Sequence, residues 1–376
     1  MREPIRLPEV EARDDRVVLG LMSGTSMDGL DLALVRIGAG ATPRVATLAH
    51  RTAAQPDELA LSPKACLALD TAGLARLNTA LGRFYGEAAR LFCDELGLRP
   101  DLVGLHGQTV YHEHGLTTLQ IGDPHFLAEM LACPVVSDFR SADVAVGGSG
   151  APLVPFVDRL LLADPAGTVV ALNLGGIANV TILPADGSPV RGFDTGPANS
   201  LIDAAVRALT QGRSRHDQDG AWAARGRVDA ALLAELLAHP FFALPPPRST
   251  GPEQFGAALA EELLRRPNLA EADLLATLTE LTAQSVAQAI SLHAPGTLRV
   301  VASGGGVRNR HLMDRLAQAL SGTPLVSSAT AGIDPDAKEA IAFALLASLR
   351  IDRIPTNLPA VTGASRPVLL GRICEV

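Results

Sequence analysis

A β-hairpin with a polar tip is the sequence feature that most constrains the fold of this chain. Residues 17–37 read VVLGLMSGTSMDGLDLALVRI, in which two runs of β-forming apolar residues flank a short polar segment. Gly24 and Gly29 allow the backbone to approach a ligand closely, and the hydroxyls of Thr25 and Ser26 add donors to the backbone N–H groups. The tip therefore predicts a cradle for a phosphate chain, although its composition alone is also that of an ordinary hairpin loop.

Two carboxylates, Asp28 and Asp31, stand beside this predicted cradle. Acidic groups next to phosphates are expected only where a cation lies between them, and Mg²⁺ is the usual ion because it binds through one or two carboxylates and substrate phosphates. We therefore expect Asp28 to bind Mg²⁺. The residues expected to bind the phosphates are Gly24, Thr25, Ser26, Met27, Asp28, Gly29, Leu30 and Asp31.

The same pattern recurs near the middle of the chain. Residues 168–183 read TVVALNLGGIANVTIL, a strand, a tip containing Gly175 and Gly176, and a second strand, with Asn173 just before the tip. The 376 residues are too many for one ordinary core. We therefore expect two similar α/β domains that face each other, each offering a hairpin tip to one bound nucleotide.

Polar side chains follow two predicted strands in the first half of the chain. His106, Gln108 and Thr109 come just after the apolar strand 101–105, and Asp138 and Arg140 come just after a second short strand. Ligands bind at the carboxyl ends of strands in open α/β sheets, and these side chains suit sugar hydroxyls. A loop steadied by ion pairs is the alternative.

A short strand in RGFDTGPANSLID carries Asp194 into a Thr-Gly-Pro turn that precedes a predicted helix. The turn predicts that Asp194 points into the cleft, where a carboxylate can act as a general base. An aspartate that only caps the turn or the helix is the alternative.

A third glycine-rich segment follows the apolar strand 298–302. A strand, three consecutive glycines and a helix allow a flat ring to lie against the backbone, which suits the adenosine end of a nucleotide. The residues concerned are Gly304, Gly305, Gly306 and Asn309.

Composition excludes several classes of partner. The net charge is −8 and no basic stripe is present, so neither nucleic acid nor an anionic membrane is an expected partner. The four cysteines have no metal-binding spacing and are expected to be reduced thiols, which favours a cytoplasmic protein. Residues 1–16 have no apolar core, so we expect a loose leader rather than a signal peptide or an anchor.

Taken in order, the motifs resemble those of the anhydro-N-acetylmuramic acid kinase family, within the superfamily of acetate and sugar kinases, heat-shock chaperones and actin. The resemblance covers residues 17–373 and is carried by LMSGTSMDGLD, HGQT, SDFR with AVGGSGAPLVP, NLGGIANV, GFDTGPAN, PPPRSTG, SGGGVRN and KEA. Two positions depart from the family pattern, since Ala198 stands where Gly is usual and Pro252 where Arg is usual.

The resemblance implies an α/β fold of two duplicated actin-like (ribonuclease H-like) domains flanking a nucleotide-binding cleft. With it we expect an N-terminal domain over residues 1–145 and a C-terminal domain over residues 146–376. It implies ATP and Mg²⁺ as cofactors, Asp194 as the catalytic base, Glu339 of the KEA motif as a sugar contact, and a homodimer. Closure of the two domains over the sugar is expected, as in other kinases of this architecture.

The implied reaction phosphorylates O6 of 1,6-anhydro-N-acetylmuramic acid while water opens the anhydro bridge at C1, a step of cell-wall recycling. Two alternatives remain open. One is another kinase or phosphatase of the superfamily that acts on a hexose or on polyphosphate. The other is a nucleotide-gated binding protein of the actin or chaperone kind.

Overall fold

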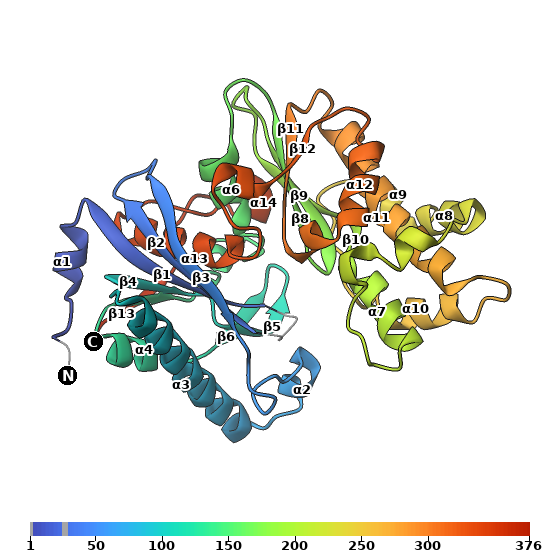
Figure 1. Ribbon diagram of the computed structural model, residues 1–376. Helices are drawn as coiled ribbons and strands as arrows, with labels where there is room; N and C mark the ends of the chain where they lie inside the picture. The colour runs from blue at the N-terminus through green and yellow to red at the C-terminus, as the bar shows by residue number, and fades with distance from the viewer. Residues whose placement is uncertain (1–2, 25–28) are drawn as a thin grey trace. The chain divides into compact units, whose positions relative to one another are not determined.

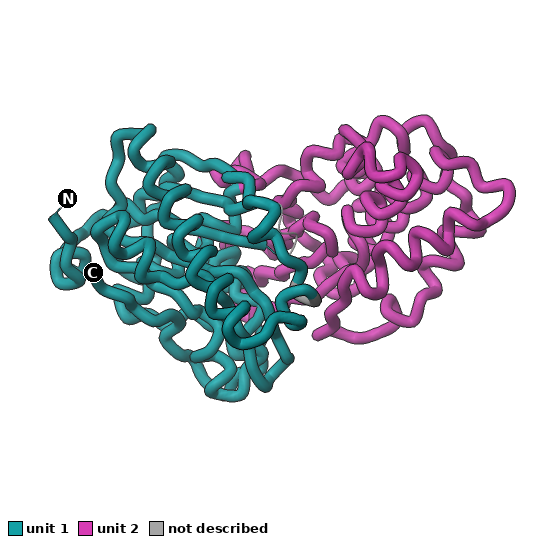
Figure 2. The backbone as a smooth tube through the Cα atoms, turned by 90° about the horizontal axis from the view of Figure 1, so that it is seen from below, with its two compact units in different colours: residues 1–160, 337–376 teal, residues 161–336 magenta. Residues whose placement is uncertain are grey.

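The computed structural model describes residues 3–24 and 29–376, except for the side chains of residues 63 and 64. The chain forms two compact units (Figure 2): unit 1 comprises Met1–Leu160 and Ala337–Val376, and unit 2 comprises Leu161–Asp336. These bounds differ from the two domains expected from the sequence, 1–145 and 146–376. The difference arises because the last forty residues, 337–376, return to unit 1 and supply it with two helices and an edge strand.

Unit 1 is built on a mixed six-stranded sheet with the order β13-β7-β4-β1-β2-β3. β1 pairs antiparallel with β2, and β2 with β3, whereas β1–β4 and β4–β7 are parallel. A small hairpin of β5 and β6 stands apart from this sheet. The strands are β1 (Asp15–Ser23), β2 (Leu30–Gly38), β3 (Val45–Ala53), β4 (Leu102–Leu105), β5 (Gln108–Glu113), β6 (Thr117–Ile121), β7 (Val135–Ser137) and β13 (Arg372–Cys374).

Helix α13 (Lys338–Ile351) packs directly on the strands of unit 1 (Figure 1). Gly20 in β1 and Gly104 in β4 make this possible, because a Cβ at either position would collide with the carbonyl oxygen of Ala340 or of Phe343. The backbones of helix and sheet therefore meet without side chains between them, which fixes α13 along its axis.

The other helices of unit 1 begin and end where the sequence places caps. The long helix α3 (Thr71–Leu96) starts at the N-cap Asp70, which accepts a bond from Gly73 N, and ends at Gly97 with φ 63°. The remaining helices are α1 (Leu7–Glu11), α2 (Pro63–Leu67), α4 (Pro124–Leu131), α5 (Ser141–Val144), α6 (Val154–Leu162, which continues two residues into unit 2) and α14 (Pro359–Thr362).

The N-terminal segment is held rather than loose. Arg16 is 1% exposed; its guanidinium donates to the carbonyl oxygens of Val10 and Glu11 and forms an ion pair of 2.7 Å with Asp352. These contacts hold the end of α1 to unit 1.

Unit 2 repeats the sheet of unit 1. Its order is β10-β9-β8-β11-β12, so that the first three strands form an antiparallel meander and the next two add in parallel beside the first. Without the separate hairpin β5–β6, the first five sheet strands of each unit thus lie in the order third, second, first, fourth and fifth; in unit 1, β13 adds at the edge. This shared order confirms the predicted duplicated α/β fold. The strands are β8 (Val169–Leu174), β9 (Ile177–Leu183), β10 (Arg191–Pro197), β11 (Arg299–Ser303) and β12 (Leu325–Ser327).

Two apolar cores stabilise unit 2. One joins the sheet to the second half of α11 (Glu271–His293) and to α12 (Arg310–Ala319), and the other joins the first half of α11 to neighbouring helices. The further elements are α7 (Asn199–Leu209), η1 (Gln218–Gly220), η2 (Ala223–Arg225), α8 (Ala230–Leu237), α9 (Pro240–Ala243), α10 (Ala257–Leu264), η3 (Gly305–Arg308) and η4 (Ser328–Ala331). Among the described residues no helix is both long and apolar enough to cross a membrane.

Candidate functional site

The first predicted tip joins β1 to β2 in unit 1. Ser23 pairs with Leu30 and Met22 with Asp31, so the described flanks form the expected hairpin. Asp31 Oδ1 accepts a bond of 2.6 Å from Thr52 Oγ1 on β3. Thr25, Ser26, Met27 and Asp28 lie outside the described residues, so their predicted roles, including Asp28 as a metal ligand, stay predictions.

Gln108 holds the base of this hairpin. Ser23 Oγ donates to Gln108 Oε1 at 2.6 Å, and Gln108 Nε2 donates to the carbonyl oxygen of Gly24 at 3.3 Å. Since Gln108 is 2% exposed, its side chain orients the backbone where the predicted phosphate cradle begins. Sequence reasoning expected a sugar contact from Gln108 and missed this supporting position.

His106 and Arg140 form a buried pair at the carboxyl end of β4. The guanidinium of Arg140 donates to His106 Nε2 from Nη2 at 2.8 Å and from Nε at 3.2 Å. Burial, together with the charge of Arg140, lowers the pKa of His106 to about 3, so this imidazole is neutral at pH 7. Burial lowers the pKa of Arg140 to about 10, which leaves it charged. The pair thus holds a positive charge in a fixed position at the carboxyl end of β4.

Asp138 lies in a pocket of about 310 Å³ that His106, Asn78, Gln120 and His125 also line. Asp138 has φ 53°, accepts a bond from Ser141 N at 3.2 Å, and forms a 3.0 Å ion pair with Arg372. Asp138, in the stretch SDFR, thus lines the same pocket as His106, and its carboxylate also holds the loop through Ser141 and Arg372.

Thr109 lies on β5 and is not among the residues that line this pocket. Its hydroxyl accepts a bond of 3.2 Å from Gln120 Nε2. Its predicted contact with the sugar stays a prediction.

Glu339, in the first turn of α13, is surrounded by charged groups of unit 1. Burial raises the pKa of its carboxyl, Lys338 and Arg140 work to lower it, and Asp31 and Asp158 work to raise it. Charge interactions therefore connect Glu339 both to the hairpin that carries Asp31 and to the Arg140 side chain.

The second tip, in unit 2, is held by the start of α7. Asn199 Nδ2 donates to the carbonyl oxygens of Leu174 and Gly175, at 3.1 and 2.8 Å, and Ser200 N donates to Gly176 O at 2.9 Å. Asn173 pairs with Asn179 across the hairpin and with Ser303 of β11. The second predicted tip and the glycine-rich segment are therefore neighbours.

The three glycines after β11 have different roles. Gly304 has φ 83°, and a Cβ there would lie 2.6 Å from Asn173 Oδ1; a Cβ at Gly306 would lie 2.6 Å from Leu174 Cβ. Gly305, in contrast, would place its Cβ in open space with nothing described within 4 Å. The outer glycines let the segment pack against the second tip, and Gly305 leaves an open backbone surface.

Asn309 is the N-cap of α12, because its Oδ1 accepts a bond of 2.9 Å from Leu312 N. The segment 217–223 lies against Asn309: a Cβ at Gly220, which has φ 68°, would collide with Asn309 Oδ1. Asp217, 7% exposed, fixes that segment by accepting bonds from Trp222 N and Ala223 N. The predicted adenosine contact of Asn309 stays a prediction.

Asp194 lies at a β-bulge in β10, where the register with β9 shifts. Its Oδ2 accepts bonds from Ser249 Oγ at 3.0 Å and from Thr250 N at 2.9 Å, whereas Oδ1 accepts none from the described residues. Burial raises the pKa of this carboxyl, although the two donors and the charge of Arg248 oppose the rise. One oxygen is thus fixed and the other is available to a ligand.

Hydrogen bonds with residues 245–251, the segment PPPRSTG, support the backbone of the Asp194 turn. Asp194 N donates to Arg248 O and Arg248 Nε donates to Asp194 O, both at 3.0 Å. The Arg248 guanidinium also lies over the rings of Phe193 and Phe241, at 5.6 and 5.0 Å from their centroids. The motif therefore acts in part by holding the backbone of the turn.

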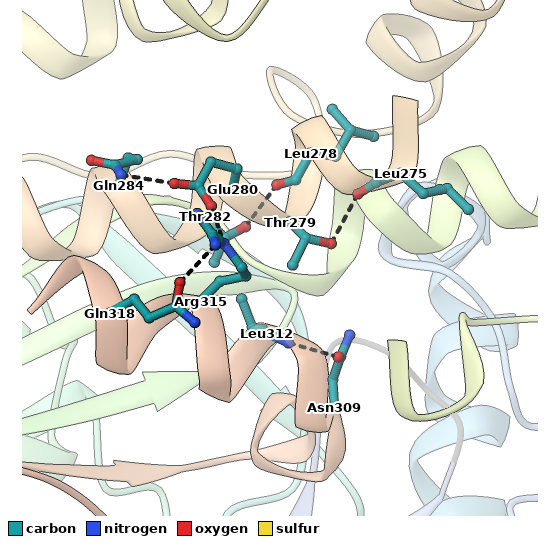
Figure 3. Close-up of polar contacts among 10 residues, drawn as sticks. All are labelled: Leu275, Leu278, Thr279, Glu280, Thr282, Gln284, Asn309, Leu312, Arg315 and Gln318. Atoms are coloured by element: carbon teal, nitrogen blue, oxygen red, sulfur yellow. Dashed lines mark hydrogen bonds and ion pairs between the residues drawn. The ribbon is translucent and has the colours of Figure 1, made fainter. Parts of the chain in front are cut away.

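Helix α11 connects the two parts of this site in unit 2. Thr282 Oγ1 donates to Pro197 O at 3.0 Å, three residues beyond Asp194. Figure 3 shows Glu280 of α11 facing Arg315 of α12, the helix that Asn309 caps, with an ion pair of 2.6 Å. Gln284 donates to Glu280, and Arg315 donates to Gln318 (Figure 3). The Asp194 turn and the glycine-rich segment are thus tied to one helix.

Ala198, which is fully buried, has φ −118° and ψ −103° just before α7. Pro252 is exposed at the turn before α10. Neither departure from the family pattern disturbs the contacts of Asp194. Among the described ranges 3–24 and 29–376 no three His, Cys, Asp or Glu side chains gather as a metal site.

Comparison with known proteins identifies the family of this chain. The family model described as anhydro-N-acetylmuramic acid kinase matches residues 16–375. A relative of that name from Xanthomonas campestris pv. campestris (strain 8004) is 46% identical, with 94% of this chain and 96% of the relative covered. Another from Streptomyces coelicolor is also 46% identical, over 95% of this chain and 93% of the relative. A third from Caldanaerobacter subterraneus subsp. tengcongensis is 39% identical, over 98% and 99%. This chain therefore belongs to the anhydro-N-acetylmuramic acid kinase family.

Proposed function

We propose that this protein uses ATP and water to convert 1,6-anhydro-N-acetylmuramic acid into N-acetylmuramic acid 6-phosphate and ADP, in peptidoglycan recycling. Family membership supports the reaction. The observation that carries the mechanism is the Asp194 carboxylate, with Oδ2 fixed by Ser249 and Thr250 and Oδ1 without a partner among the described residues.

Asp194 is the general base in this proposal. Cleavage of the anhydro bridge builds positive charge at C1, and Asp194 takes a proton from the water that attacks C1 on the face opposite the departing O6. O6 keeps the electron pair of the broken C1–O6 bond and attacks the γ-phosphorus of ATP, so that ADP leaves. Its partly buried setting raises the pKa of Asp194, which strengthens it as a base.

The nucleotide is assigned to the two tips and the glycine-rich segment. Asn173, Gly175 and Gly176 face the phosphates with the first tip, and Gly304, Gly305, Gly306 and Asn309 take the adenosine. The open backbone at Gly305 supports this assignment, because a ring can approach it without meeting a side chain. Mg²⁺, when bound, neutralises phosphate charge; Asp28 is the carboxylate proposed to hold it.

The sugar is assigned to polar groups of unit 1. The fixed guanidinium of Arg140 suits an anionic or hydroxyl oxygen of the sugar, and the carboxylates of Asp138 and Glu339 accept hydrogen bonds from hydroxyl or amide groups. His106 orients Arg140 through Nε2. Gln108 supports the first tip, and Thr109 is proposed as a further contact.

We also propose a cytoplasmic location, where ATP is available, and a homodimer, by analogy with the family. The reaction is tested by measuring ADP release with and without the anhydro sugar. Release that depends on the anhydro sugar supports the proposal. Release with an ordinary hexose would indicate another sugar kinase, and slow release that no sugar stimulates would indicate a nucleotide-gated binding protein.

A further inference from the structure

A buried ion pair lies next to Glu339. Lys338 Nζ is 2.7 Å from Asp158 Oδ1, and the two side chains are 5% and 4% exposed. Lys338 is the first residue of α13 and Asp158 lies on α6. The pair therefore joins two helices of unit 1 that are distant in the sequence.

Stability alone does not account for this pair. Removing two charges from water costs free energy, and well-packed apolar residues of similar volume usually stabilise a fold as well or better. Lys338 also places a positive charge at a helix N-terminus, where the helix dipole disfavours it. An apolar contact would join α6 to α13 at lower cost.

The first turn of α13 is where the pair has an effect. From Ala340 onward α13 is fixed by its close backbone contact with Gly20 and Gly104. Among the described residues no side chain caps its N-terminus. Glu339 lies in this first turn, between Lys338 and the part of α13 that packs on Gly20 and Gly104. The ion pair between Lys338 and Asp158 adds a contact at this first turn, one residue before Glu339.

We propose that Lys338 and Asp158 are positioning residues that hold the Glu339 carboxylate in place for the sugar. Lys338 also favours the ionised form of that carboxylate, whereas Asp158 opposes it. This inference rests on the proposed function, in which Glu339 contacts the sugar. The charged groups that surround Glu339 are Asp31 on β2, Arg140 before α5, Asp158 on α6 and Lys338 on α13. Lys338 is the cation with the largest influence among them.

Two single substitutions have opposite electrostatic effects. Lys338→Met removes a cation, so the pKa of Glu339 rises. The pKa still rises if the unpaired Asp158 becomes protonated, because Lys338 affects the pKa of Glu339 more than Asp158 does. Asp158→Asn removes an anion and keeps a hydrogen-bond acceptor for Lys338, so the pKa of Glu339 falls. A pair whose charges do not reach Glu339 would produce no shifts of opposite sign.

The experiment measures kcat and both KM values from pH 5 to 9 for the unmodified protein, Lys338→Met, Asp158→Asn, Lys338→Arg and the apolar double variant Lys338→Met with Asp158→Leu. We expect a sugar KM raised about tenfold or more in Lys338→Met, with the ATP KM little changed, and partial rescue in Lys338→Arg. The acidic limb of kcat/KM for the sugar should move to higher pH in Lys338→Met and to lower pH in Asp158→Asn.

The double variant separates positioning from stability. We expect it to fold with an unchanged melting temperature and still show the raised sugar KM. Full activity of the folded double variant, or limbs that move in the same direction in both single variants, would overturn the inference. A second readout needs no turnover: side-chain carboxyl ¹³C signals of labelled glutamate, assigned with Glu339→Gln, report the pKa of Glu339 directly. If the unmodified protein shows no sugar-dependent ADP release, the proposed function fails instead, and the ¹³C titrations still decide the electrostatic claim.

Discussion

Ser249 Oγ lies 3.0 Å from Asp194 Oδ2 and donates a hydrogen bond to it, although the two residues are 55 positions apart in the chain. With Thr250 N, this contact fixes one oxygen of the carboxylate and leaves the other without a partner among the described residues. The proposed general base is thus oriented by a segment that the sequence does not place beside it.

Asp194→Asn should lower kcat about 10²- to 10⁴-fold, the range for a lost general base. An asparagine can still accept the bonds from Ser249 and Thr250, so the turn and nucleotide binding should survive. Steady-state kinetics and nucleotide titration check this, with Asp186→Asn, at an exposed turn of the same unit, as the control. An Asp194→Asn enzyme near full activity would show that Asp194 is only a turn residue.

Ser249→Ala should move the acidic limb of kcat/KM to higher pH. The Ser249 hydroxyl stabilises the ionised form of Asp194, so its loss raises the pKa of that carboxyl further above its ordinary value. A base must be deprotonated, so activity is lost as the pH falls through this pKa, and the loss now begins at a higher pH. A pH–rate profile that is unchanged or displaced to lower pH would contradict the assignment.

Gly305→Val should raise the ATP KM about tenfold or more and leave both the sugar KM and the melting temperature nearly unchanged. A Cβ at Gly305 meets no atom of the described residues within 4 Å, so the change should interfere mainly with a ligand. Gly304→Ala is the matched contrast. With φ 83° and Asn173 in contact, that change should cost about 1–3 kcal/mol of unfolding free energy. Equal effects of Gly305→Val on both substrates would rule out the adenosine assignment.

Arg315→Met should lower the unfolding free energy of unit 2 by about 2 kcal/mol, a value reduced from that of a fully buried pair because Arg315 is one-third exposed. Burial works to raise the pKa of Glu280, but the bonds from Arg315 and Gln284 outweigh it and lower the pKa. The stabilisation is therefore present above the ordinary glutamate pKa and is lost as the pH falls through the lowered one.

Urea unfolding from pH 7 down to about pH 4 checks this, since the difference between the variant and the unmodified protein should shrink over that range. Gln318→Ala removes only the second contact of Arg315 and should cost less. A difference that grows with acid would contradict the role given to Glu280.

The sequence predicted the repeated hairpins well, because alternating apolar runs around Gly-rich tips are local signals. It could not reveal that residues 337–376 return to unit 1, since nothing in the helix beginning at Lys338 marks Gly20 and Gly104 as its contacts. Likewise the sequence, which predicts a sugar contact for Gln108, could not reveal its bonds to Ser23 and the Gly24 carbonyl. Long-range partners of this kind leave no periodic trace.

The central claim, that Asp194 activates water at C1 while O6 leaves to phosphorus, is tested most directly by turnover in ¹⁸O-labelled water. An anhydro sugar has no free O6 hydroxyl, so the account predicts label on the anomeric carbon, none in the new phosphate ester, and an inverted C1 configuration in the product first formed. The product must be trapped before anomeric exchange removes the label. Label recovered in the phosphate ester instead would show that water attacks phosphorus and would contradict the mechanism.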